Sequence, residues 1–163
     1  MQQLLDNSTQ SKIKSFSEIA DLLKKIRQRG EKIVQCHGVF DLLHPGHLIT
    51  LMQARNLAGP HGCVVVGLNS DESIKRLKGP SRPILPEIAR AQMLIAMRYV
   101  DHVVTFHEDT PAELLAHLRP EVIVKGGDYD PKSVVGKEMA LVITAPYHDT
   151  WSTSNIIEKI KGS

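Results

Sequence analysis

Residues 62–69 read GCVVVGLN, a run that is apolar almost without interruption. Apolar residues on both faces are typical of a strand in the middle of a parallel sheet, because helices cover such a strand from both sides. This stretch therefore predicts an α/β fold in which residues 62–69 form a central strand.

The sequence on both sides of this strand alternates between strand-like and helix-like segments. Ser15 and Glu18 have the spacing of a capping box, and apolar residues then recur at helical intervals until Gly30. Further strands are expected at residues 32–37, 102–106, 121–125 and 141–145, and further helices at 47–58, 86–97, 111–118, 131–139 and 154–161. About five strands alternating with as many helices predict a Rossmann-like, doubly wound parallel sheet with right-handed crossovers and helices on both faces.

Length and composition limit the class of protein. The chain has 163 residues, of which 42% are hydrophobic and 23% charged, so one packed domain is expected and a disordered or fibrous chain is excluded. Residues 1–12 are expected to form a flexible tail and residues 13–163 the folded domain. The net charge of +2 gives no reason to expect a nucleic acid or a membrane surface as partner. No apolar run approaches the ~20 residues of a membrane-spanning helix, and the N-terminus lacks the pattern of a signal peptide.

The sequence contains two cysteines, Cys36 and Cys63, and each lies inside an apolar, strand-like run. Cysteines in such positions are typical of buried, reduced thiols that pack in a core rather than of a disulfide framework. Reduced thiols favour a cytoplasmic location.

The segment GVFDLLHPGH, residues 38–47, directly follows a predicted strand and leads into a helix. Ligands of doubly wound sheets bind where strands end, so this segment is a candidate site. His44 and His47 are three residues apart at a helix start, where both imidazoles could contact one group. Gly46 allows a ligand to approach the backbone closely, and the free N–H groups of a helix N-terminus favour an anion such as phosphate. The segment therefore indicates phosphate chemistry, with the imidazoles as hydrogen-bond donors.

Two other interpretations of the histidine pair stay open. Two histidines can ligate a metal, although no third ligand follows at a plausible spacing and Cys36 lies within a strand. The histidines could also be surface residues that cap a helix, although that role would not require Gly46.

Residues 38–47 resemble the His-x-Gly-His signature of the cytidylyltransferase-like nucleotidyltransferases. The resemblance implies that a phosphate or similar oxygen of an acceptor attacks the α-phosphate of a nucleotide triphosphate, and that pyrophosphate leaves with Mg²⁺. It also implies that His44 and His47 stabilise the reacting phosphorus centre, while Asp41 is expected to orient the loop or a histidine. The residues of this segment that are implied to bind the nucleotide are Gly38, Val39, Phe40, Asp41 and Gly46.

Polar and basic residues follow the strand GCVVVGLN. Four cations within residues 75–82 fall in a predicted loop with glycine and proline, where a polyphosphate would lie. The resemblance assigns a catalytic, phosphate-binding lysine to this loop, which we identify as Lys78, with Lys75 as the alternative. The residues expected to bind the acceptor substrate are Asn69, Asp71 and Arg82.

Three later segments complete the expected site. Arg90 matches an arginine of the family in the next helix, although an ordinary exposed arginine would also fit there. Residues 125–129 (KGGDY) follow a strand, and their glycines let the backbone approach a base or ribose. Residues 151–155 (WSTSN) align with the family's C-terminal Ser-Thr-Thr segment, whose hydroxyls suit a phosphate, although a plain helix cap explains them equally well. The nucleotide-binding residues expected in these segments are Arg90, Lys125, Gly126, Asp128, Ser152 and Thr153.

Within the family, the motifs of residues 12–161 together resemble the adenylyltransferases that act on D-glycero-β-D-manno-heptose 1-phosphate. This resemblance implies ATP and a sugar 1-phosphate as substrates, nucleotide-heptose supply for lipopolysaccharide core or other surface glycans, and a homo-oligomer. In many cells that activity is half of a protein that also carries a heptose kinase, and here the kinase half is expected to be absent. Two positions depart from the family's pattern, because Ser154 replaces a threonine and Trp151 is unusual.

Rival functions stay open at this point. A CTP-dependent cytidylyltransferase for a small phosphorylated alcohol shares the histidine signature and Arg90, but carries an arginine where residues 147–149 read YHD. An adenylyltransferase for a cofactor precursor would differ in its acceptor. A nucleotide-binding regulatory domain without turnover would bind ATP and release no pyrophosphate, and a hydrolase with a metal at the histidine pair would bind zinc tightly.

Overall fold

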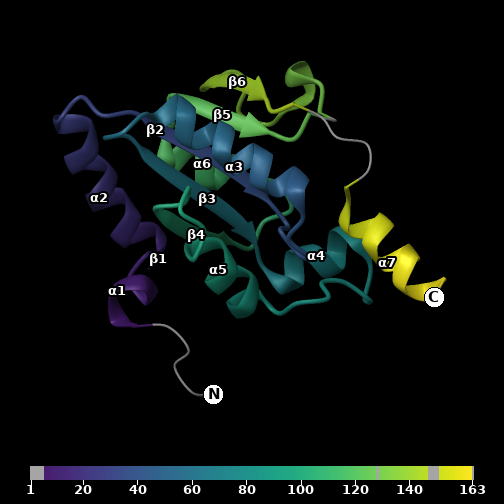
Figure 1. Cartoon of the computed structure of the whole chain (residues 1–163). Helices are drawn as coiled ribbons and strands as arrows, with labels where there is room; N and C mark the ends of the chain where they lie inside the picture. The colour runs from purple at the N-terminus through teal and green to yellow at the C-terminus, as the bar shows by residue number, and fades with distance from the viewer. Residues whose placement is uncertain (1–5, 128, 147–150, 163) are drawn as a thin grey trace.

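A computed structural model of the chain describes residues 6–127, 129–146 and 151–162. Within these ranges the strands form one parallel sheet of six strands in the order β1-β4-β3-β2-β5-β6 (Figure 1). The strands are β1 (Ile13–Lys14), β2 (Ile33–Gly38), β3 (Cys63–Asn69), β4 (His102–Phe106), β5 (Val122–Lys125) and β6 (Leu141–Thr144). The helices are α1 (Asn7–Gln10), α2 (Phe16–Gln28), α3 (Pro45–Ala58), α4 (Asp71–Lys78), α5 (Glu87–Ile95), α6 (Ala112–Leu118), the 3-10 helix η1 (Pro131–Ser133) and α7 (Thr153–Lys161).

Helices cover both faces of the sheet, as the apolar run of β3 predicts. On one face, α3 and α5 pack against β2, β3, β4 and β5, with Leu51 and Leu94 fully buried (Figure 1). On the other face, α2 and α6 pack through Leu23 and Leu114, which are equally buried. Every residue of β3 is buried. This arrangement confirms the predicted Rossmann-like α/β fold.

The strand order changes direction next to β2. The chain moves outward from β2 to β3 and β4, and then returns to place β5 on the other side of β2. In open α/β sheets, ligands bind beyond the carboxyl ends of the strands at such a switch point. The segments that follow β2 and β5 are those in which the sequence places its histidine and glycine motifs.

The sheet has one strand more than expected, because β1 pairs with β4 at the edge. The helix α1 also lies within the segment expected to be a flexible tail, and Asp6 caps it by accepting a hydrogen bond from the backbone N–H of Thr9. The boundary of the folded domain at residue 13 stays a prediction.

Two segments differ from the secondary structure expected of them. The basic segment after β3 is helical through Lys78, because Ser70 caps α4 and Ile74 anchors it in the core, so the loop begins only at Gly79. In the segment expected to be a helix at residues 131–139, only η1 forms. Gly136 has φ +94, a left-handed conformation that interrupts a helix, and a Cβ there would lie 2.5 Å from Cδ1 of Leu115.

Both cysteines are free and buried, as predicted. Burial raises the pKa of each thiol to about 12, so both stay protonated and unreactive at neutral pH. Among the described residues, no helix combines the length and apolar character needed to cross a membrane.

Candidate active site

A cavity of about 540 Å³ opens at the carboxyl ends of β2, β3, β4 and β5. It is bordered by the ends of these strands, the loop of residues 38–44, the start of α3 and the start of α7. The predicted site residues that line it are Gly38, Val39, Phe40, Asp41, His44, Gly46, His47, Asn69, Lys78, Arg82, Lys125, Gly126, Ser152 and Thr153. The structure therefore brings together most of the residues that the sequence singled out from separate motifs.

The loop of residues 38–44 holds a strained backbone. Phe40 has φ +45, a left-handed conformation that a bulky residue adopts only when its surroundings enforce it. The Phe40 side chain is buried and its ring lies 5.0 Å from that of His47, while the carbonyl of Val39 accepts a hydrogen bond from Arg90 at 2.7 Å. Packing on one side and a charged donor on the other fix the turn that leads to the histidines.

Asp41 orients this loop and the one that follows α4, rather than a histidine. Its carboxylate is 1% exposed and accepts hydrogen bonds from Nε of Arg82 at 2.7 Å and from the backbone N–H groups of Ile84 and Leu85 at 2.9 Å. Burial raises the pKa of Asp41, but these hydrogen bonds outweigh burial and hold the pKa below its ordinary value. The carboxylate therefore stays charged and fixes Arg82 at the cavity wall.

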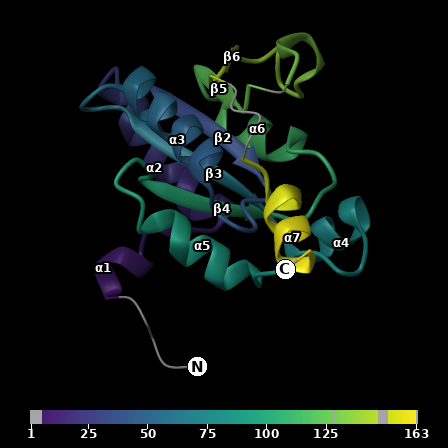
Figure 2. The ribbon, with the colours of Figure 1, turned by 45° about the vertical axis from the view of Figure 1, so that its right-hand side comes forward.

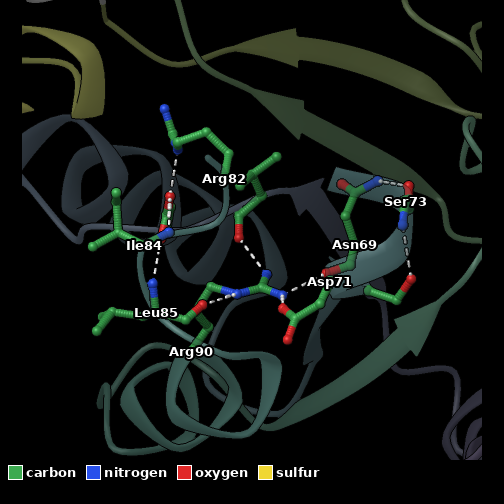
Figure 3. A network of polar contacts seen from close by, with 10 residues as sticks. Asn69, Asp71, Ser73, Arg82, Ile84, Leu85 and Arg90 are labelled. Carbon is green, nitrogen blue, oxygen red and sulfur yellow. Dashed lines mark hydrogen bonds and ion pairs between the residues drawn. The ribbon is translucent and has the colours of Figure 1, made fainter. Parts of the chain in front are cut away.

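Arg90 lies at the centre of a buried network (Figure 3). Its guanidinium donates to the carbonyls of Leu85 at 3.0 Å, Val39 at 2.7 Å and Asn69 at 3.0 Å, and to the carboxylate of Asp71 at 2.7 Å. Arg90 is 1% exposed, so the alternative of an ordinary exposed helix arginine is wrong. One side chain thus joins the loop after β2, the end of β3 and the start of α5.

Arg90 and Asp71 are not among the described residues that line the cavity. Their places in the expected nucleotide and acceptor sites stay predictions. The contacts of Arg90 support an indirect role, because it holds the carbonyls of Val39 and Asn69, two residues that do line the cavity.

His44 and His47 form a stacked pair, with ring centroids 3.8 Å apart. His44 occupies the N-cap position of α3, but its side chain makes no capping hydrogen bond, so the capping interpretation does not explain it. The Nδ1 atoms of both rings are buried and have no hydrogen-bond partner in the described part of the chain. Burial lowers the pKa of His44, and burial, aided by the positive charge of Lys78, lowers that of His47 to about 3. Both imidazoles are neutral at physiological pH.

Gly46 lies between the two histidines, where a side chain would crowd the His44 ring. A Cβ at this position would lie 3.0 Å from Nδ1 and Cε1 of His44 and 3.6 Å from the carbonyl oxygen of Trp151. The glycine thus allows the His44 ring to pack on the first turn of α3. The described residues contain no group of three His, Cys, Asp or Glu side chains that could hold a metal ion.

Two basic residues of the candidate phosphate site come from the segment after β3. Lys78 is the last residue of α4 and borders the cavity, whereas Lys75, the alternative, is not among the described lining residues. Arg82 follows in the loop and is held by Asp41.

Lys125 supplies a further cation from the end of β5. It is 8% exposed, its ammonium donates to the backbone carbonyl of His37 at 3.1 Å, and it lies 4.3 Å from the centre of the Tyr129 ring. Gly126 and Gly127 border the cavity beside it. Asp128, expected to bind the nucleotide, lies outside the described residues.

The start of α7 forms the remaining wall. Ser152 caps this helix by accepting a hydrogen bond from the N–H of Asn155 at 3.0 Å, and Thr153 donates to the carbonyl of Leu42 at 3.4 Å. Trp151 borders the cavity and is 45% exposed. Figures 1 and 2 both place α7 near α4, at the end of the sheet where the strands terminate. Ser152 is a helix cap, and its position on the cavity leaves its hydroxyl available to the predicted phosphate site.

Sequence reasoning missed several cavity residues. Phe106, Asp109 and Pro111 border the cavity from the end of β4 and the turn into α6, where the rule of strand ends applies equally. His37 also borders it, from the end of β2. The sequence feature that could have identified His37 is its position directly before the motif of residues 38–47.

Comparison with known proteins decides the family. Residues 35–159 match the family described as Cytidylyltransferase-like. The chain belongs to this family. Membership confirms the enzyme class that the histidine motif indicates, a nucleotidyltransferase.

Relatives of known sequence and structure agree with this membership. The chain is 48% identical over 155 residues to the Bifunctional protein HldE of Syntrophotalea carbinolica, an alignment that covers 92% of this chain and 31% of that protein. It is 48% identical over 153 residues to the Bifunctional protein HldE of Campylobacter jejuni subsp. doylei, covering 93% and 32%. The chain thus spans about a third of the length of these curated relatives. A solved structure, the lipopolysaccharide core biosynthesis protein from Thermoplasma volcanium GSS1, matches with a TM-score of 0.62 and 27% identity over 74% of this chain and 100% of that one.

Proposed function

We propose that the protein transfers an adenylyl group from ATP to D-glycero-β-D-manno-heptose 1-phosphate, giving ADP-D-glycero-β-D-manno-heptose and pyrophosphate. An oxygen of the sugar phosphate forms a bond to the α-phosphorus of ATP, and the bond between that phosphorus and the β-phosphate oxygen breaks. The observation that carries the proposal is the stacked pair of His44 and His47 at the first turn of α3, inside a cavity bordered by basic side chains.

The burial of the histidine pair supports a role as hydrogen-bond donors. Both Nδ1 atoms lack a partner among the described residues, and a buried N–H without a partner is rarer than a buried acceptor without one. We therefore assign the proton of each neutral imidazole to Nε2. Two Nε2–H donors side by side would stabilise the negative charge that develops on the oxygens of the reacting phosphorus.

The basic residues supply binding and charge neutralisation. Lys78 and Lys125 border the cavity at the ends of α4 and β5, and the N-terminus of α7 adds free N–H groups beside Ser152. A phosphate monoester is already nucleophilic, so catalysis rests on position and charge stabilisation rather than on a strong base.

Mg²⁺ is proposed to enter the cavity bound to ATP. No acidic cluster for a resident metal is found in the described ranges, and Mg²⁺ in enzymes of phosphate transfer is held largely by substrate phosphates and water. Mg²⁺ bound to the nucleotide would neutralise charge on the departing pyrophosphate.

The choice of acceptor rests on the relatives and on the sequence motifs. The chain aligns with proteins named Bifunctional protein HldE and with a solved structure named as a lipopolysaccharide core biosynthesis protein. These names support a place in heptose and lipopolysaccharide synthesis, and the motifs of residues 12–161 support the adenylyltransferases for heptose 1-phosphate within the family.

Pyrophosphate release tests this proposal. The protein is incubated with Mg²⁺, either ATP or CTP, and either the heptose 1-phosphate or glycerol 3-phosphate. Release with ATP and the heptose 1-phosphate alone is the expected result. Release with CTP or with glycerol 3-phosphate instead would overturn the substrates, and binding of ATP without release with any acceptor would overturn the reaction.

A further inference from the structure

A third imidazole borders the cavity, and it differs from the catalytic pair. His37 and Gln35 project from β2 on the side of the sheet covered by α6, because a Cβ built on the neighbouring Gly67 would meet Leu114, Gln35 and His37. The Nδ1 of His37 lies 3.0 Å from Oε1 of Gln35, which is fully buried. In this orientation of the Gln35 amide the oxygen faces the ring, so we assign the proton of His37 to Nδ1.

His37 is neutral at physiological pH. Burial, together with the positive charge of Lys125, lowers its pKa to about 3. The ammonium of Lys125 donates to the backbone carbonyl of His37 at 3.1 Å. In a neutral imidazole with its proton on Nδ1, Nε2 is a hydrogen-bond acceptor. No described residue is recorded as a partner of this Nε2, and His37 borders the cavity.

Nε2 of His37, a hydrogen-bond acceptor, belongs to a cavity that several hydrogen-bond donors also border. The catalytic imidazoles are assigned as Nε2–H donors, and Lys78 and Arg82 are cations at the same cavity. A lone pair repels a phosphate oxygen, so His37 cannot add to phosphate binding. It can bind a group that donates a hydrogen bond. In the substrates of the proposed reaction most such donors are the hydroxyl groups of the ribose and the heptose, and the other is the amino group of adenine.

We propose that His37, held in the Nδ1–H form by Gln35, determines specificity by accepting a hydrogen bond from a hydroxyl group of a polyol substrate. This inference rests on the proposed nucleotidyl transfer for the identity of its substrates. The hydroxyl belongs to the ribose of the nucleotide or to the sugar of the acceptor. Gln35 is a positioning residue in this arrangement.

Two substitutions separate the proposed contact from a structural role. His37→Asn retains an amide N–H that can donate to Gln35 but removes the acceptor at the Nε2 position, whereas His37→Gln returns an amide oxygen close to that position. Loss of one hydrogen bond is expected to weaken binding of one substrate about 3- to 10-fold in His37→Asn, with kcat changed less than about twofold. His37→Gln is expected to recover part of the loss. His102→Asn, on β4 at the end of the sheet away from the cavity, is the matched control and is expected to change neither constant.

Calorimetric titration with ATP, with 2′- and 3′-deoxyATP, and with the heptose 1-phosphate identifies the source of the hydroxyl. If the hydroxyl belongs to the ribose, either 2′- or 3′-deoxyATP binds to the wild type more weakly than ATP does. The variant His37→Asn then binds that deoxynucleotide and ATP equally tightly. If it is the acceptor, only the Kd of the heptose 1-phosphate rises. Unchanged Kd values for both ligands in His37→Asn would overturn the inference.

The tautomer gives a test that does not depend on turnover. Nitrogen NMR of histidine-labelled protein distinguishes Nδ1–H from Nε2–H, and Nδ1–H is expected for His37. A proton on Nε2 would overturn the inference even if pyrophosphate is released. Absence of pyrophosphate release with every acceptor would instead overturn the proposed function, while the titrations and the NMR signal still decide the role of His37.

Discussion

The loop of residues 38–44 and the helix α7 border the same cavity but are held in place very differently. The loop is fixed by the buried groups of Asp41 and Arg90, and it includes the strained Phe40. In contrast, α7 has no buried residue within its described length, and its recorded hydrogen bond to the loop is the 3.4 Å contact from Thr153 to Leu42.

The difference shows which parts of the site are held in position by the folded core and which depend on few contacts. The loop and the histidines are in position before a substrate arrives, because the folded core compensates for the strain and for the buried charges. The position of α7 depends on its own cap and on few contacts, so ligand contacts have more influence there. Substitutions of the buried groups that hold the loop should therefore reduce global stability, substitutions at the histidine pair should reduce turnover, and substitutions in α7 should affect nucleotide binding.

The largest effect is expected for His47→Ala. Loss of one preorganised donor to the developing charge should lower kcat by about 10²–10³-fold. The melting temperature should change by only a few degrees, because the Nδ1 of His47 makes no hydrogen bond to a described residue. Steady-state pyrophosphate release and thermal melting measure the two effects. A melting temperature lowered by many degrees, with kcat reduced only in proportion to the unfolded fraction, would make His47 a structural residue.

Removal of Arg90 should reduce stability most among these variants. Arg90→Met leaves the carbonyls of Val39, Leu85 and Asn69 without their donor, which is expected to cost about 3 kcal/mol of the free energy of unfolding. The Asp71 carboxylate is partly exposed and contributes little to that figure. Arg76→Met is the matched control, because it breaks an exposed ion pair with Asp109 and should cost no more than about 1 kcal/mol. The free energy of unfolding of both variants is measured by urea unfolding. An equal loss of this free energy in the two variants would contradict the central role of Arg90.

Gly46→Ala should reduce activity without reducing stability. The added Cβ would lie 3.0 Å from the His44 ring, which must move, and a displaced catalytic group is expected to lower kcat by about 10- to 100-fold. Alanine favours the helix by about 1 kcal/mol relative to glycine, so the melting temperature should not fall. Gly162→Ala, whose Cβ would make an ordinary 3.4 Å contact at the end of α7, serves as control. Normal turnover of Gly46→Ala would show that the position of His44 is not critical.

Two serine caps test the contrast between α7 and a helix of the core. Ser15→Ala removes the capping box of α2, which buries Ile19, Leu23 and Ile26, and should lower the free energy of unfolding by about 1 kcal/mol. Ser152→Ala removes the cap of α7, and should lower it by less than about 0.5 kcal/mol because local fraying of this helix costs little packing. The KM for ATP should rise about threefold in Ser152→Ala alone. An equal loss of global stability in both variants would show that α7 is part of the cooperative core.

The smallest effect is a pH dependence of stability near neutrality. Burial lowers the pKa of His37 and His47 to about 3, whereas in the unfolded chain each titrates near 6.5. The unfolded state therefore binds more protons between these values, so stability is complete above pH 6.5 and falls as the pH decreases toward 3. The loss should stay below about 1 kcal/mol at pH 6.5. Urea unfolding between pH 8 and 6.5 measures it, and His47→Ala should show a shallower dependence. Greater stability at pH 6.5 than at pH 8 would contradict the burial of these imidazoles.

The fold was largely predictable from local patterns. The apolar run of β3 and the capping box of Ser15 and Glu18 each report a requirement that acts within a few residues. The helix α4 was missed because its charged residues suggest a loop, although Ser70 as a capping residue and the apolar Ile74 four residues later were available as signals. The helix expected at residues 131–139 is interrupted at Gly136, which has φ +94 and leaves no space for a Cβ beside Leu115 and Ile123, a tertiary feature that no local pattern reveals.

The candidate site was predictable where one motif carries it and not where distant segments meet. His44, Gly46 and His47 lie within one segment, and all three border the cavity. The burial of Arg90 depends on carbonyl groups from two other segments, so sequence spacing could not reveal it. The environment of His37 similarly depends on Lys125 of another strand.

The most direct test of the central claim is to follow the α-phosphoryl group of ATP. The protein is supplied with Mg²⁺, the heptose 1-phosphate and ATP labelled with ³²P at either the α or the γ position, and the products are separated. We expect the α label in a nucleotide sugar and the γ label in pyrophosphate, with both products strongly reduced in His47→Ala. An α label that stays in ATP, ADP or AMP, or a γ label that appears on the sugar, would contradict nucleotidyl transfer at this site.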